Sequence, residues 1–214
     1  MRIRFNTALA GLALSAALGA AQALTVTTGN IPQPDQSNVI RNACGLDAGS
    51  AEGTTILGCL NDDHAQLISV ASDESIRWVG GGQARIRASS GLYSQLEVSA
   101  LDASLQTLIL NLNVASDGFV SFSDGMETSA LFEVDANGQN FFTITGLSGS
   151  LSLTTFSDAV GTESDIIRDT RQVRVTLGPL AAIPETDTYA LLMAGLGALF
   201  FVARRRAPAA LRER

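Results

Sequence analysis

The strongest constraint on the fold is an alternation of apolar and polar residues that recurs from residue 67 to residue 177. It is clearest in 107–114, and it returns in 171–177, where every second residue from Val173 to Leu177 is aliphatic. Successive side chains of a β-strand point to opposite faces, so a period of two indicates strands with one buried and one solvated face. The chain is therefore predicted to form an all-β domain.

Turn signals separate the alternating runs. Asp-Gly or Asn-Gly pairs stand at 117–118, 124–125 and 137–138, and such pairs favour tight hairpins. The expected strands are 92–101, 107–114, 118–123, 130–135, 140–145, 150–156 and 171–177. Their spacing predicts an antiparallel β-sandwich of jelly-roll type. Glycines and prolines interrupt residues 24–60, where we expect one short strand and then a loop-rich region.

The N-terminus has the pattern of a secretory signal peptide. Arg2 and Arg4 precede an apolar stretch, residues 8–18, and Ala21-Gln22-Ala23 follows. A basic region, a short apolar helix and an Ala-x-Ala site predict export, with cleavage after Ala23. The alternative is an uncleaved N-terminal anchor, which the short apolar region disfavours.

Near the C-terminus, residues 188–203 form an uncharged apolar run of 16 residues, followed by Arg204, Arg205 and Arg206. A helix of this length spans roughly 24 Å. A full membrane span takes about 20 residues, and flanking side chains that reach the interface can compensate for a shorter run. The arginines would lie on the cytoplasmic side. The alternative is a buried core helix of a soluble domain, which three consecutive arginines at its end disfavour.

Pro184-Glu185, the apolar run and the three arginines together resemble the PEP-CTERM sorting signal, also catalogued as the ice-binding-protein C-terminal motif. The resemblance covers about residues 183–206. It implies recognition by an exosortase, a membrane cysteine transpeptidase, and a place among the secreted or surface proteins of Gram-negative bacteria that make exopolysaccharide. The family's third motif residue is typically proline, whereas this chain has Thr186. Cleavage at the motif and retention as a membrane anchor both remain open.

These signals divide the chain into four parts. They are a signal peptide (1–23), an exported β-domain (24–183), a sorting segment (184–206) that contains the transmembrane helix 188–203, and a short cytoplasmic tail (207–214). The exported domain contains two cysteines, Cys44 and Cys59. An even number of cysteines in an exported chain predicts a disulfide, and closing a loop of this length stabilises the fold by about 3 kcal/mol.

The charge of the exported domain limits the kinds of partner that it can bind. Residues 24–183 carry 18 acidic residues against 7 arginines, and the chain has no lysine. We expect no basic patch on such a domain and therefore no nucleic-acid binding, which requires neutralisation of phosphates. The expected partners are the membrane, an exosortase-type enzyme and exopolysaccharide, with no cofactor and no metal site.

Two groups of residues could carry chemistry. The only histidine, His64, follows Asp62 and Asp63, and this cluster is the basis of a hydrolase alternative. No Gly-x-Ser-x-Gly elbow accompanies it, and a solvated turn is the favoured interpretation. Trp78 and Tyr93 flank a triple glycine and could stack on a sugar, which is the basis of a carbohydrate-binding alternative, although buried packing is favoured. The sequence thus favours an exported, non-enzymatic protein with a structural or adhesive role.

Overall fold

The computed structural model describes residues 23–47, 51–80, 85–180, 193–196 and 199. The chain divides into two units, and the first ends at Gly178. We call its described part, from residue 23, the β unit. The predicted signal peptide up to residue 22, the motif residues Pro184, Glu185, Thr186 and Arg204 to Arg206, and the predicted tail 207–214 lie outside the described residues.

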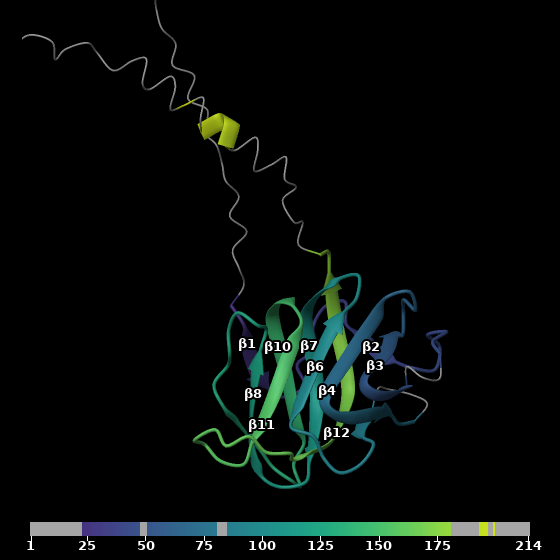
Figure 1. The fold of residues 1–214 in the computed structure, drawn as a ribbon, viewed down its shortest axis with the longest axis vertical. Helices are drawn as coiled ribbons and strands as arrows, with labels where there is room; N and C mark the ends of the chain where they lie inside the picture. The colour runs from purple at the N-terminus through teal and green to yellow at the C-terminus, as the bar shows by residue number, and fades with distance from the viewer. Residues whose placement is uncertain (1–22, 48–50, 81–84, 181–192, 197–198, 200–214) are drawn as a thin grey trace, which may run out of the picture. The chain divides into compact units, whose positions relative to one another are not determined.

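The all-β prediction is confirmed for the described part of the chain, whose strands pair antiparallel throughout (Figure 1). The strands are β1 (Thr25–Thr28), β2 (Ser37–Ile40), β3 (Glu52–Leu60), β4 (Leu67–Trp78), β5 (Arg85–Ala88), β6 (Gln95–Ala100), β7 (Ser104–Val114), β8 (Gly118–Ser123), β9 (Phe132–Val134), β10 (Asn140–Gly149), β11 (Leu151–Phe156) and β12 (Ile167–Gly178).

The predicted β-sandwich is wrong, because the strands form one continuous hydrogen-bonded sheet and not two separate ones. Its order is β1-β10-β7-β12-β2-β3-β4-β6-β11-β8-β9, and β5 pairs with both β12 and β4. The cause lies in the two longest strands, which have 12 residues each. β4 pairs with β6 through 68–72 and with β5 through 76–78, while β12 pairs with β5 through 169–171 and with β2 at 174–175. Strands β12, β2, β3, β4 and β5 consequently close a ring.

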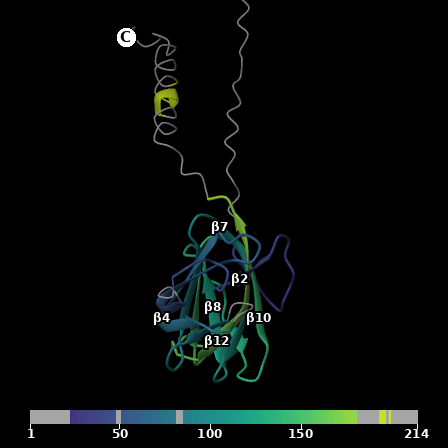
Figure 2. The same ribbon diagram turned by 90° about the vertical axis from the view of Figure 1, so that its right-hand side faces the viewer.

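The rest of the sheet brings its two ends together, so that β8 and β9 at one end pack against β10, the neighbour of the terminal strand β1 at the other. Figure 2 shows β4 and β10 on opposite sides of the β unit. Phe122 of β8, Phe132 of β9 and Phe142 of β10 join the ends, with ring centroids 5.0–6.2 Å apart. Tilted and edge-on aromatic pairs at these distances add to the burial energy of the rings.

The alternation seen in residues 107–114 places Leu108, Leu110 and Leu112 in the core, where all three are fully buried. Ile109 points to the opposite face and is also fully buried. It lies opposite Thr143, which binds the segment between β1 and β2 through the Ile31 amide at 3.0 Å and the Gly29 carbonyl at 2.9 Å. The N-terminal segment therefore covers this outer face, and a period of two alone does not reveal that cover.

The predicted disulfide between Cys44 and Cys59 is confirmed, with 5.5 Å between the two Cα atoms. It ties the loop after β2 to β3. Strand β3 lies within residues 24–60, which were expected to be rich in loops after one short strand. Gly58 lies within β3 because a side chain would not fit there. A Cβ would come within 2.8 Å of the Ile40 carbonyl oxygen and 2.9 Å of the Trp78 ring. This glycine permits close packing and does not interrupt the strand.

Of the predicted transmembrane run 188–203, residues 193–196 and 199 are described, and they are helical. The remainder of the run lies outside the described residues. Among those that are described, no helix is both long enough and apolar enough to cross a membrane.

Candidate functional site

The predicted cluster around His64 does not assemble into a site. Asp62 accepts a hydrogen bond from the Ser37 hydroxyl, and Asp63 accepts one from the Ala65 amide at 3.1 Å. His64 is exposed, and in the described part of the chain it forms no hydrogen bond with either carboxylate. The three residues form a solvated turn between β3 and β4. No group of three or more potential ligands close enough to hold a metal ion occurs among the described residues.

Trp78 and Tyr93 do not form an exposed aromatic platform. Tyr93 is fully buried, and this burial raises the pKa of its phenol. Its hydroxyl lies 2.7 Å from the Thr170 hydroxyl. Trp78 is partly buried against the core, and its indole N–H donates to the Leu57 carbonyl at 2.9 Å. Both polar groups are used within the fold, and this supports the packing interpretation over sugar stacking.

The outer face of β4, β6 and β11 is open and polar. Cross-strand register places Ala71, Glu97 and Ser152 in one row, and Gln95 and Thr154 in the next. A shallow groove of about 320 Å³ crosses this face; it is lined by Ala71, Ser72, Asp73, Gln95, Leu96, Glu97, Ser152, Leu153 and Thr154. The groove offers hydroxyl, amide and carboxylate groups but no aromatic side chain.

Asp73, at the edge of this groove, is committed to structure. It accepts hydrogen bonds from the Ser94 amide and hydroxyl, at 3.2 and 2.7 Å, and from the Gln95 amide at 3.0 Å. Burial raises the pKa of this carboxyl, but the hydrogen bonds, with a further one from Ser72, outweigh burial and leave it below its ordinary value. The charged form thus holds the start of β6 against β4.

A second carboxylate, Asp169 of β12, is fully buried beneath two arginines. It accepts hydrogen bonds from Arg85 of β5 at 3.0 Å, from Asn113 of β7 at 2.9 Å, and from Arg171, whose Nε and Nη2 both donate to it. Burial raises the pKa of the carboxyl, whereas the bonds from Arg171, Arg85 and Asn113 lower it, with a net result of about 2. This centre links three strands where the ring closes.

The expectation that the domain has no basic patch is wrong. β5 places Arg85 and Arg87 on one face, and β4 and β12 add Arg77 and Arg171 directly beside them. The Arg-x-Arg spacing at 85 and 87 was the available signal, because residues two apart in a strand share a face. The other two arginines are brought in by cross-strand pairing.

Comparison with protein families, curated proteins and solved structures finds no match to this chain. Its function therefore has to be inferred from its own residues.

Proposed function

We propose that this chain is an exported, non-enzymatic protein with a structural or adhesive role in the cell envelope or its exopolysaccharide matrix. We further propose that its C-terminal segment acts as a PEP-CTERM sorting signal read by an exosortase-type enzyme. The observation that carries the proposal is that the two ends of the β unit leave from the same end of the sheet. This arrangement suits a domain that follows a signal peptide and precedes a membrane segment, because both connections then leave from one end of the domain.

Cross-strand register supports this placement of the ends. Thr25 pairs with Thr145, Thr145 with Thr107, and Thr107 with Thr176, so the start of β1 and the end of β12 share one row. Figure 1 shows β1 beginning and β12 ending at the upper end of the β unit. The Leu24 amide, one residue after the proposed cleavage site, donates to the Glu127 carboxylate at 3.1 Å.

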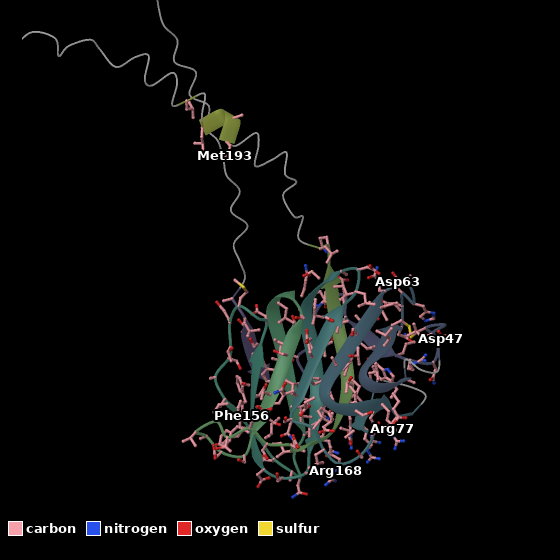
Figure 3. The ribbon with its side chains drawn as sticks, viewed as in Figure 1. Asp47, Asp63, Arg77, Phe156, Arg168 and Met193 are labelled. Atoms are coloured by element: carbon pink, nitrogen blue, oxygen red, sulfur yellow. A yellow bond between two sulfur atoms is a disulfide. The ribbon has the colours of Figure 1, made fainter. Side chains whose placement is uncertain are left out.

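The disulfide supports an oxidising compartment. Disulfides persist outside the cytosol and are rare within it. The Cys44–Cys59 bridge joins β3 to a loop that contributes few residues to the core, so the fold depends on it at this edge (Figure 3).

A carbohydrate-binding module is the second candidate, favoured by the polar groove on β4, β6 and β11. Polar side chains that converge in an open groove can exchange hydrogen bonds with sugar hydroxyls. The hydrolase alternative receives no comparable support, because the Asp62, Asp63 and His64 side chains do not converge.

The intact mass of the protein, recovered from an exopolysaccharide-producing Gram-negative host and measured with and without reductant, tests the proposal. We expect a chain that begins at Leu24 and gains the mass of two hydrogens on reduction. A mass that retains residues 1–23 contradicts export. Ala23→Lys is the control, since it should block cleavage at the signal site. Replacing Arg204, Arg205 and Arg206 by Gln should release the protein from the envelope if the tail is the sorting signal, and unchanged retention would contradict that role.

A further inference from the structure

Four arginines share one outward face where β4, β5 and β12 meet. Arg77 lies directly opposite Arg87, and Arg85 lies directly opposite Arg171. Ile86 and Ala88, which alternate with the two β5 arginines, are buried, so the arginines point outward. We call Arg77, Arg85, Arg87 and Arg171 the arginine patch.

The patch stands out against the charge of the domain around it. Residues 24–183 contain 7 arginines against 18 acidic residues, and four of these arginines lie here. Two carboxylates share the face. Asp169 is buried and bound by Arg85 and Arg171, while Glu52 lies opposite Arg77 on its other side. The patch therefore keeps a net positive charge within an acidic surface.

The two arginine pairs differ in their partners. Arg85 and Arg171 hold the buried carboxylate of Asp169 between them. Arg77 and Arg87 form no ion pair or hydrogen bond with any residue that the structure describes, although Glu52 is a cross-strand neighbour of Arg77 and Asp169 is one of Arg87. Arg77 is exposed and Arg87 is half-buried. Like charges directly opposite on a sheet repel each other. The pair lies between two carboxylates, Glu52 opposite Arg77 and Asp169 opposite Arg87, but neither arginine is hydrogen-bonded to them.

Guanidinium groups arranged in this way suit a carboxylate ligand. Each one presents planar N–H donors in a fork that matches the two oxygens of a carboxylate, and adjacent forks strengthen the interaction. Neighbouring strands lie about 5 Å apart and alternate residues about 7 Å apart. The Cα atoms of the patch therefore span roughly 10 by 7 Å. A patch of this size accommodates the acidic groups of a short stretch of polymer.

We propose that Arg77 and Arg87, backed by Arg85 and Arg171, bind the carboxylate groups of an acidic polysaccharide. The inference deepens the proposed matrix role and rests on it for the choice of polymer. The acidic remainder of the domain repels a long, densely charged rod such as duplex DNA, and a flexible chain with spaced carboxylates meets less of that repulsion. Strand β12 ends at the top of the β unit in Figure 1, and Arg77 lies toward the bottom of the same unit (Figure 3).

Calorimetric titration of the full chain in detergent tests the site, with polygalacturonate as the probe and neutral dextran as its uncharged counterpart. We expect binding of polygalacturonate only, and weakening as salt rises, because the patch is exposed. Arg77→Gln with Arg87→Gln should lower the affinity by about tenfold or more. Arg77→Lys with Arg87→Lys should keep an intermediate affinity, since lysine retains the charge but not the fork.

The matched control changes net charge equally at other sites. Gln106→Glu with Asn137→Asp also makes the chain more negative by two, and both residues are exposed and distant from the patch in sequence. We expect this control to bind polygalacturonate like the parent. The proposal is overturned if the Arg77, Arg87 double variant binds like the parent, if the control loses as much affinity, or if duplex DNA binds as tightly as polygalacturonate. Circular dichroism of each variant checks that the fold is kept.

The two proposals fail separately. Loss of export with intact binding of polygalacturonate by the purified chain refutes the proposed function and leaves the site. Normal export of a chain that does not bind polygalacturonate removes the site and leaves the envelope role.

Discussion

The arginine patch contains two like-charge pairs on the same face of the sheet, and the two pairs have different roles. Arg85 and Arg171 lie opposite each other and both bind the buried carboxylate of Asp169, whereas Arg77 and Arg87 lie opposite each other, between Glu52 and Asp169, with no ion pair. The first pair belongs to the closure of the ring and should contribute to stability. The second pair makes no ion pair or hydrogen bond within the described fold, so its guanidinium groups are available to a ligand. A charged cluster on a sheet can thus divide into a structural half and a binding half one residue pair apart.

Substituting Asp169, the carboxylate that Arg85 and Arg171 share, should cause the largest loss of stability. Asp169→Asn leaves Arg85 and Arg171, which are 35% and 40% exposed, opposite each other without their shared counter-charge. We expect the free energy of unfolding to fall by about 2–3 kcal/mol, less than for a fully buried ion pair because water reaches both arginines. Chemical denaturation monitored by tryptophan fluorescence measures the change. A loss below about 1 kcal/mol would mean that the Asp169 centre is not structural.

The pH dependence of stability should carry the signature of the same carboxylate. The pKa of Asp169 is lowered from 3.8 to about 2 in the folded state, so its charged form stabilises the fold above pH 4. That contribution, about 2 kcal/mol, is lost as the pH falls from about 4 through 2. Denaturation at pH 6 and pH 2.5 should show the loss in the parent and a smaller loss in Asp169→Asn. Asp73, whose pKa is also lowered, is present in both proteins and cancels in the comparison. Equal losses in the two proteins would contradict the assignment.

A single substitution in each half compares them directly. Arg85→Gln removes a charge-assisted hydrogen bond to a buried carboxylate and should cost about 1–2 kcal/mol, the lower part of the range because the arginine is 35% exposed. Arg87→Gln, two residues further along β5, removes no contact within the described fold and should change stability by less than about 0.5 kcal/mol. Thermal unfolding of both variants provides the measurement. Equal effects would remove the distinction between the halves.

The smallest expected effect on stability is that of the Arg77→Gln, Arg87→Gln double variant. It removes the repulsion between the two arginines and also their attraction to Glu52 and Asp169, so the free energy of unfolding should change by less than about 0.5 kcal/mol. The same variant is expected to lose affinity for polygalacturonate. A melting temperature clearly below that of the parent would show that these arginines have a structural partner after all.

The sequence revealed local features well and long-range pairing poorly. Alternation identified β7, β8 and β10 because each strand shows its own burial pattern, and Cys44 and Cys59 were paired correctly because the chain offers no other thiol. β3 was missed because Gly53 and Gly58 indicated a loop, whereas Gly58 makes room for Trp78. One edge of β4 is divided between β5 and β6, and one edge of β12 between β2 and β5; this division, which joins the strands into one sheet, leaves no local trace in the sequence.

The arginine patch was missed for the same reason. Arg171 reaches Arg85 only through the pairing of β12 with β5, across most of the domain sequence. Arg77 meets Arg87 through a second pairing, and the acidic net charge of the domain concealed both. The register of strands distant in sequence depends on the whole fold, so a local pattern cannot supply it.

The most direct test of the account is the titration of polygalacturonate into the full chain, its Arg77→Gln, Arg87→Gln variant and its Gln106→Glu, Asn137→Asp control. We predict that the parent and the control bind equally and that the arginine variant binds about tenfold more weakly or worse while remaining as stable as the parent. Equal binding by all three proteins would contradict the assignment of the unpaired arginines to a ligand.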